Sequence, residues 1–471
     1  MKAIYEELLR GIPDYKEFLT ARELDESSFA LAKEHPDVVS VFPFGETKEG
    51  RTLQCMKISG GKHVALMFGC PHPNEPIGTM MLEYFTRALA ENKALRDELD
   101  YTWYIVKAWD YDGLMLNEKW LKGPYTLYNY SRNFFRPAGF KQVDWTFPID
   151  YKELHFHEPI PETQAMMKLI DEIHPEFIYS LHNAGFGGVY WYETAATPEI
   201  YDDLHAAPLS QDVPMNLGEP EAPYCQLLAP AIYKELSITD EYDYLEKYGA
   251  KNIGDIIKVG SCSADYANKR WGSFTMLTEE PYFFDRRIND LSDADVTRGE
   301  AALEGLDWVE KANAFLCGEL NKTIRYMDKE NPFKLALEAF TENKSNEATR
   351  NMIKSNPDFA KPATVAEKFD NVLIKKFYKL LQYGMLIRAN ELELERMKES
   401  GEVNPEKEAA LSAAAKTAEV EHKKLSDYLE KEINYEVVPI RKLVYIQLCC
   451  GLHMAEYLKA HPEKLKKAAE D

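Results

Sequence analysis

A histidine and a glutamate stand three positions apart, at His72 and Glu75, directly after an apolar run over residues 64–68. The run has the composition of a buried strand, and the prolines that follow it end the strand. A neutral imidazole and a carboxylate are two good ligands for Zn²⁺. Open α/β sheets build their sites at the carboxyl ends of their strands. The pair therefore predicts part of a zinc site at the end of a strand.

A third ligand is expected at His182, which follows a second apolar run over residues 177–181 and precedes a glycine-rich stretch. Two histidines and one glutamate are the ligand set of a catalytic zinc, because they leave one coordination position for water. A lone histidine at a strand end is more often an ordinary hydrogen-bonded residue, but that interpretation fits the two motifs together poorly. A competing pair, His155 and His157, lacks a third ligand in a recognisable motif, so we interpret it as part of a loop.

A general base is expected at Glu279 or Glu280, two adjacent carboxylates after a third apolar run. Side chains alternate between faces along a strand, so only one of them can point into the site. The other is expected to be solvated or salt-bridged. An anion anchor is expected in the segment 129–136, because a guanidinium grips a carboxylate with two parallel hydrogen bonds. The segment offers Arg132 and Arg136, and position alone does not decide between them.

These residues must be positioned by alternating strands and helices. Strand patterns lie at residues 38–41, 53–58, 64–68, 101–108, 177–181 and 273–278, and helical patterns at 79–90 and 161–171. Such alternation implies a mostly parallel sheet that is covered on both faces. The predicted fold class is α/β, with a mixed, mostly parallel central sheet flanked by helices and an all-helical C-terminal domain.

The chain divides into three predicted parts. We predict a helical leader over residues 1–40, a catalytic domain over residues 41–325 and a helical C-terminal domain over residues 326–471. Long amphipathic patterns in the last part run over residues 335–340, 365–396, 405–432 and 439–458. The helical domain is expected to pack on the catalytic domain or to mediate a homo-oligomer. It could also cap the active site and restrict access to it.

Composition excludes several classes of function. The chain has 471 residues, a formal net charge of −22 and a pI of about 5.1, which argues against a surface for nucleic acid or anionic membranes. Its apolar segments are too short to span a bilayer. The seven cysteines are scattered without a CxxC pair, which indicates free thiols in a reducing compartment. Together with an N-terminus that lacks the pattern of a secretory signal, these features predict a cytoplasmic protein.

Taken in order, the motifs resemble those of the zinc carboxypeptidase family. The matching segments are His72-Pro-Asn-Glu75, the preceding Gly45 to Arg51, Asp110-Tyr-Asp-Gly113, Tyr130-Ser-Arg132-Asn133-Phe134, Leu181-His182-Asn183 and Gly260 to Asn268. The resemblance covers residues 40 to 320 and does not extend to the C-terminal helices. In the family, the catalytic glutamate follows the aspartate of the last motif by fourteen positions, and Glu279 follows Asp265 by the same number.

The resemblance implies a function and a site. One Zn²⁺ would be held by His72, Glu75 and His182, with Glu279 as the general base of a metallocarboxypeptidase. The implied substrate-binding residues are Arg132, which would hold the C-terminal carboxylate of a peptide or amino-acid amide, Ser131 in place of the family's asparagine, and Ala264 in the specificity pocket. Ile257 stands where the family has a pocket tyrosine, and the nearest candidates for its oxyanion arginine are Lys119 and Lys122.

Two alternatives stay open at this point. The missing tyrosine and the altered arginine motif favour a zinc amidohydrolase that acts on a small N-acyl amino acid. A non-catalytic binding protein on the same fold is the other alternative, although the intact ligand set and Glu279 argue against it.

Overall fold

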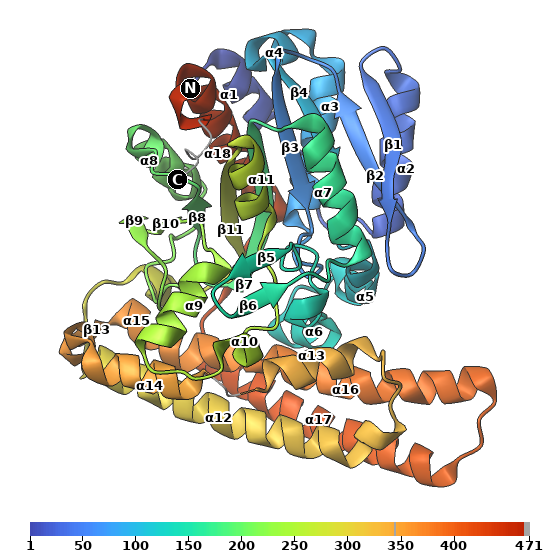
Figure 1. Cartoon of the computed structure of the whole chain (residues 1–471), viewed down its shortest axis with the longest axis vertical. Coiled ribbons are helices and arrows are strands. Elements are labelled where there is room, and N and C mark those ends of the chain that lie inside the picture. Colours follow the sequence, from blue (N-terminus) through green and yellow to red (C-terminus); the bar gives the residue numbers. More distant parts are fainter. Residues whose placement is uncertain (343–344, 466–471) are drawn as a thin grey trace.

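A single large sheet runs through the centre of the protein in the computed structural model, which describes residues 1–342 and 345–465 (Figure 1). The strands of this sheet are β1 (Val39–Glu46), β2 (Thr52–Ile58), β3 (His63–Gly69), β4 (Tyr101–Val106), β7 (Phe177–Phe186), β8 (Tyr190–Glu193), β9 (Leu227–Ala229), β10 (Ile232–Lys234), β11 (Phe274–Phe284) and β14 (Glu436–Val437). Their order is β1-β2-β4-β3-β7-β11-β8-β10-β9, with β14 also paired to β11. Neighbours from β4 to β11 are parallel, whereas β1, β2, β9 and β14 pair antiparallel with their neighbours, so the sheet is mixed as predicted.

Helices cover both faces of this sheet. One face packs against α1 (Ala3–Arg10), α3 (Ile77–Glu91), α8 (Tyr201–Ser210) and α18 (Ile440–Ala460), and the other against α7 (Pro161–Ile173) and α11 (Ser263–Trp271). The remaining elements of this part are α2 (Ala21–Glu34), α4 (Lys93–Leu99), α5 (Tyr111–Leu121), α6 (Leu127–Asn133), β5 (Ile149–Tyr151), β6 (Leu154–Phe156), α9 (Ile238–Lys247) and α10 (Ile253–Ile256). Because helices cover both faces of the sheet, the central strands are continuous apolar runs in the sequence.

Alternation along the central strands decides which side chains meet. Phe177, Tyr179 and Leu181 of β7 belong to the core under α3 and α18, whereas Ile178 belongs to the core under α7. The side chain of His182 therefore leaves β7 on the same side as Ile178. Glu279 of β11 is the register partner of His182, so both side chains leave the sheet on one face. Strands β7 and β11 both extend past these residues, so they are longer than the sequence patterns predicted.

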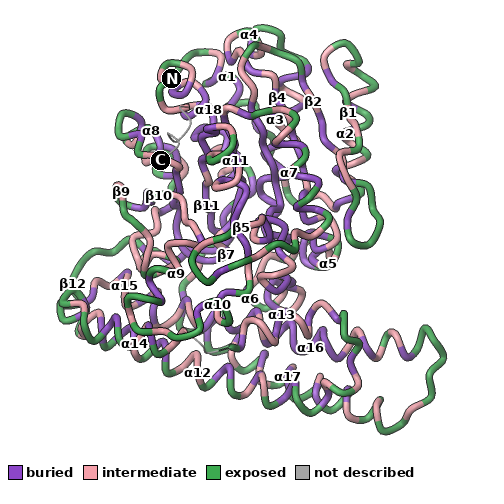
Figure 2. The backbone as a smooth tube through the Cα atoms, in the orientation of Figure 1, coloured by how far each residue is buried: buried purple, intermediate pink, exposed green. Residues whose placement is uncertain are grey.

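A group of long helices lies across one end of the sheet (Figure 1). Its members are α12 (Arg298–Thr323), α13 (Pro332–Phe340), α14 (Asn346–Ser355), α15 (Val365–Phe369), a π-helical turn (Asp370–Ile374), α16 (Lys375–Ser400) and α17 (Pro405–Glu432), together with a small antiparallel sheet of β12 (Asp293–Thr297) and β13 (Pro362–Thr364). Helices α16 and α17 form a hairpin whose tip is exposed (Figure 2). Within the described residues, no helix is both long and apolar enough to cross a membrane.

The last long helix returns to the sheet. Helix α18 packs against α3 and α8 and contacts β7 and β11, and the hydroxyl of Tyr179 donates a hydrogen bond to the carbonyl of Gln447 at 2.8 Å. This placement differs from the predicted all-helical domain over residues 326–471, because one of its helices belongs to the layers around the sheet. Periodicity predicted the helix correctly, but it carried no information on which core the apolar face joins.

Candidate active site

His72 and Glu75 lie on a tight turn between β3 and α3. The backbone N–H of Glu75 donates to the carbonyl of His72 at 3.1 Å, which closes the turn and brings the two side chains together. Both residues are buried, with 4% and 1% of their surface exposed. Helix α3 begins two residues after Glu75, and its first N–H, from Ile77, donates to the side chain of Asn183 on β7 at 3.1 Å. The turn is thereby fixed against the strand that carries the third expected ligand.

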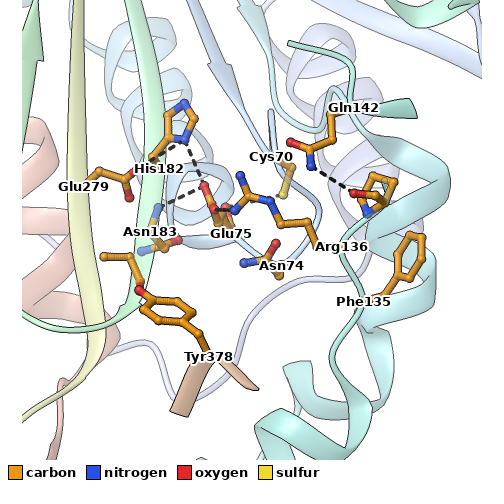
Figure 3. A network of polar contacts seen from close by, with 12 residues as sticks. Cys70, Asn74, Glu75, Phe135, Arg136, Gln142, His182, Asn183, Glu279 and Tyr378 are labelled. Atoms are coloured by element: carbon orange, nitrogen blue, oxygen red, sulfur yellow. Dashed lines mark hydrogen bonds and ion pairs between the residues drawn. The ribbon is translucent and has the colours of Figure 1, made fainter. Parts of the chain in front are cut away.

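His182 completes the group. Its Nδ1 lies 3.0 Å from Oε2 of Glu75 (Figure 3). Its ring centroid lies 4.9 Å from that of His72. Its other ring nitrogen, Nε2, lies 2.8 Å from the hydroxyl of Ser180, which fixes the orientation of the ring. Among residues 1–342 and 345–465, His72, Glu75 and His182 are the one group of three potential metal ligands whose donor atoms all lie within 4.8 Å of one another.

The donor set fits Zn²⁺. Burial, followed by the positive charge of Arg136, lowers the pKa of His72 well below its ordinary value, which favours the neutral imidazole, the form that binds metals. Its Nδ1 is buried and has no hydrogen-bond partner in the described part of the chain. A buried polar atom without a partner is costly, and a metal ion among these donors would remove that cost. Two imidazoles and one carboxylate leave a fourth position open, as in catalytic zinc sites.

Glu279 lies beside this group. Its Oε1 is 3.5 Å from Nδ1 of His182, and its Oε2 is a buried atom that lacks a hydrogen-bond partner among the described residues. Burial, followed by the negative charge of Glu75, raises the pKa of Glu279 well above its ordinary value. A carboxyl group in such surroundings can accept a proton readily and hold it, which is what a general base that later acts as an acid requires.

Glu280 leaves β11 on the opposite face and does not reach this group. The residue is fully buried against α18, and neither of its carboxyl oxygens has a hydrogen-bond partner within the described chain. Burial raises the pKa of Glu280 well above its ordinary value, which favours its protonated form. The expectation that the second glutamate is solvated or salt-bridged is therefore wrong. The sequence offered no sign that a helix from the C-terminal part covers this face.

The structure places Arg136 at the site and Arg132 away from it. Nη1 of Arg136 donates to Oε1 of Glu75 at 3.0 Å (Figure 3). The guanidinium of Arg132 instead binds Glu391 of α16 at 2.6 Å and Glu419 of α17 at 2.9 Å. Helix α6 ends at Asn133, and the backbone becomes extended at the next residue. The helix directs Arg132 toward the C-terminal helices, whereas the extended segment carries Arg136 back to the metal group.

The other two residues expected to bind substrate also lie elsewhere. Ser131 is fully buried, and its hydroxyl donates to the carbonyl of Leu127 at 2.6 Å and lies 2.8 Å from Nε2 of His422 on α17. Ala264 is buried in the first turn of α11. Neither lines the cavity beside the metal group. The segment that resembles the family's arginine motif thus serves mainly as a contact with the C-terminal helices.

The cavity beside the metal group has a volume of about 300 Å³. Its walls come from the turn after β3, the segment after α6, strands β7, β8 and β11, the loop before β9, and the start of α16. Sequence reasoning did not single out most of its residues, among them Asn183, Tyr190 and Tyr378. Asn183 follows a ligand directly, which is a signal that could have been used. Tyr378 sits in an amphipathic helical pattern, and nothing in that pattern distinguishes it from a surface residue.

Comparisons with known proteins identify a family for most of this part of the chain. A model of the family described as zinc carboxypeptidase matches residues 26–282, which is more than half of the chain. Among curated proteins, none matches this chain.

Several solved structures share parts of the architecture at low similarity. Carboxypeptidase A from Helicoverpa armigera is 16% identical over 59% of this chain and 71% of its own, with a TM-score of 0.36. A metallo-carboxypeptidase from Burkholderia cenocepacia is 15% identical over 55% of this chain and 60% of its own, with a TM-score of 0.33. Bovine thrombin-activatable fibrinolysis inhibitor is 12% identical over 56% of this chain and 86% of its own, with a TM-score of 0.33.

The match to the family model spans His72, Glu75, His182 and Glu279, and it confirms both the resemblance and the fold class predicted from the sequence. The chain belongs to the zinc carboxypeptidase family.

Proposed function

We propose that the protein is a zinc-dependent hydrolase that releases the C-terminal amino acid from a short peptide or a peptide-like substrate. The observation that carries this proposal is a buried carboxyl oxygen, Oε2 of Glu279, left without a partner in the described structure beside a His-Glu-His group that fits Zn²⁺. A non-catalytic binding site has no need of this buried acid, whereas a hydrolase needs a proton acceptor at that place.

The residues of the site have distinct roles in this proposal. A Zn²⁺ ion held by His72, Glu75 and His182 would supply a Lewis acid and lower the pKa of a bound water. Glu279 takes the proton of the attacking water and transfers it to the leaving amine, which needs a carboxyl group with a raised pKa. Arg136 offers its guanidinium to the negative charge of the substrate, because it is the arginine that lines the cavity.

A second candidate substrate class is the N-acyl amino acids. The cavity has a volume of about 300 Å³, at the lower end of the range of about 300 to 1,000 Å³ for small-molecule sites. This small volume favours an N-acyl amino acid. Both substrate classes share a carboxylate next to a scissile amide, so the same residues would serve either reaction. The two classes differ in whether a peptide chain or a simple acyl group precedes that amide.

The experiment that tests the proposal measures bound zinc and amino-acid release from a panel of short peptides and N-acyl amino acids. We compare the wild type with His182→Ala and Glu279→Gln. The expected result is one zinc per chain and release by the wild type, loss of zinc and activity in His182→Ala, and zinc without activity in Glu279→Gln. Release only from N-acyl amino acids would select the second substrate class. A wild type that binds zinc but releases nothing would contradict the proposal.

A further inference from the structure

The cavity beside the metal group is built by two regions that lie far apart in the sequence. One side includes Glu75, Asn183 and Glu279, within the part that matches the family. The other side comes from the C-terminal helices, which contribute Asp370, Ile374, Lys375 and Tyr378. These four residues occupy the π-helical turn and the first turn of α16. Single π-helical turns occur frequently at functional sites, because they shift the side chains that follow them around the helix.

Hydrogen bonds hold this side of the cavity in place. The backbone N–H of Glu219 donates to Asp370 at 2.9 Å, and the side chain of Asn371 donates to the Glu219 carboxylate at 2.9 Å. Arg298 of α12 binds the same carboxylate with two nitrogens. The π-helical turn is thereby tied to the loop before β9, so it forms a fixed wall of the cavity.

Aromatic packing holds the start of α16 against the catalytic part. The ring of Phe377 is stacked parallel to that of Tyr130, with centroids 6.2 Å apart, and lies 5.5 Å from that of Phe186 on β7. The hydroxyl of Tyr378 donates a hydrogen bond to the carbonyl of Ala184, two residues after His182. The wall is therefore joined directly to the strand that carries a metal ligand.

Tyr378 differs from its neighbours on α16 in its exposure. Phe377 and Leu380 are fully buried, whereas 40% of the surface of Tyr378 is accessible although its hydroxyl is bonded. Tyr378 also lines the cavity, so its side chain borders the space in which a substrate would lie. Figure 3 shows the ring reaching from α16 toward the strand that carries His182 and Asn183, on the side of Glu279.

We propose that Tyr378 is a specificity-determining residue that limits the length of the substrate, so that the enzyme prefers a terminal residue preceded by one or two others. This inference rests on the proposed function. A peptide that loses its C-terminal residue can extend only in the N-terminal direction, and an aromatic ring fixed across the cavity excludes further residues by volume. The C-terminal helices thus contribute to substrate selection, although they lie outside the part that matches the family.

The test compares kcat/KM for peptides that share their two C-terminal residues and contain two to six residues. Tyr378→Ala removes the ring, and we expect it to raise kcat/KM for the hexapeptide relative to the dipeptide by about tenfold or more, the size of effect that small changes in a pocket produce. Tyr378→Phe keeps the ring and loses only the hydrogen bond to Ala184, so it should keep the wild-type preference. Tyr428→Ala is the matched control, because Tyr428 lies on α17 with the same exposure, 41%, and does not line the cavity.

A second measurement separates this inference from the proposed function. Zinc-loaded Glu279→Gln should bind the same peptides without cleaving them, and isothermal titration gives the Kd for each length. The inference is supported if the dipeptide binds more tightly than the hexapeptide and if the double variant Glu279→Gln, Tyr378→Ala no longer shows this difference in Kd. This holds even if turnover is not detected. Equal binding of all lengths, an unchanged preference in Tyr378→Ala, or no binding of any length would overturn it. Length-selective cleavage that Tyr378→Ala leaves unchanged would overturn only the role of Tyr378 and leave the proposed function standing.

Discussion

Two arginines four positions apart have entirely different surroundings in this protein. Arg132 lies on α6 and is bound by glutamates of α16 and α17, whereas Arg136 lies on the extended segment that follows and reaches Glu75. The segment that carries Arg132 is the one that resembles the family's arginine motif, but the geometry assigns the neighbourhood of the metal group to Arg136. The two residues therefore offer a matched pair for mutation.

We expect Arg136→Met to lower kcat/KM by about 10²–10³-fold, because it removes a charged donor from the place where substrate charge develops. We expect Arg132→Met to leave kcat/KM within a few-fold of the wild-type value and to lower the free energy of unfolding by about 1–3 kcal/mol, because charged hydrogen bonds are lost. Steady-state kinetics and denaturant unfolding of both variants check this. The reverse pattern would return the anchoring role to Arg132.

The raised pKa of Glu280 in the folded protein makes stability depend on pH. Its folded pKa lies well above that of the unfolded chain, so above pH 5 the folded state holds a proton that the unfolded state has released. The wild-type free energy of unfolding therefore falls as pH rises from 5 to 8. Glu280→Gln removes this contribution and keeps the shape of the side chain.

The difference in unfolding free energy between Glu280→Gln and the wild type should grow toward higher pH, by at most about 1.4 kcal/mol per pH unit. Denaturant titrations at pH 5, 6.5 and 8 measure it, and kcat/KM of this variant is expected to remain near the wild-type value. A difference that is constant with pH would show that Glu280 is ionised in the folded state.

At the scale of elements, the contact between α6 and α16 decides how the C-terminal helices meet the catalytic part. A Cβ atom on Gly384 of α16 would lie 1.9 Å from the carbonyl oxygen of Ser131 on α6, so the two helices approach each other through this glycine. Arg388, one turn later, donates to the carbonyls of Asn133 and Phe134 at 2.7 and 3.0 Å and caps the end of α6. The close approach positions the same helix that carries Tyr378.

We expect Gly384→Ala to lower the free energy of unfolding by about 1–3 kcal/mol or more, because an added methyl group in a tight contact forces the backbones apart. Gly318→Ala on α12 is the control. A Cβ atom there meets nothing within 4 Å, and replacing a helical glycine with alanine stabilises by about 0.5–1 kcal/mol. Thermal and denaturant unfolding measure both effects. Equal stability of the two variants would mean that α16 can move away from α6 at little cost.

In the molecule as a whole, the part of the chain beyond the family match contributes to the core around the central sheet. Helix α18 buries fourteen residues, mostly apolar, and covers one face of β7 and β11. The side-chain amide of its Gln447 also donates to the backbone carbonyl of His182 at 3.2 Å. Removing the entire C-terminal part would therefore uncover the sheet as well as the cavity, which is why single substitutions test the role of α16 more cleanly.

We expect a chain that ends at residue 438 to lose cooperative unfolding and to aggregate, because loss of α18 exposes the core of the sheet. Replacing residues 399–406, the exposed tip of the α16–α17 hairpin, with a glycine-serine linker should leave the melting temperature and zinc content close to the wild type. Circular dichroism melts and zinc analysis compare the two. A truncated chain that melts cooperatively at the wild-type temperature would contradict an essential role for α18.

The local features of this protein could be predicted from its amino-acid sequence. Apolar runs predicted the central strands, amphipathic periodicity predicted α16, α17 and α18, and residue type and spacing predicted His72, Glu75 and His182 as one site. These features follow from short-range rules, because strand and helix periods and the tight turn between His72 and Glu75 are properties of neighbouring residues. The order of the family's motifs added the expectation for Glu279, which the register of β7 and β11 places beside His182.

Only the tertiary structure decided which distant segments meet. It turned Arg132 toward the C-terminal helices and Arg136 toward Glu75, buried Glu280 under α18, and brought Tyr378 to the cavity from a helix almost two hundred positions after His182. An amphipathic pattern shows that a helix has an apolar face but not which surface covers that face. That choice depends on the packing of the whole chain, so it could not be read from any one segment.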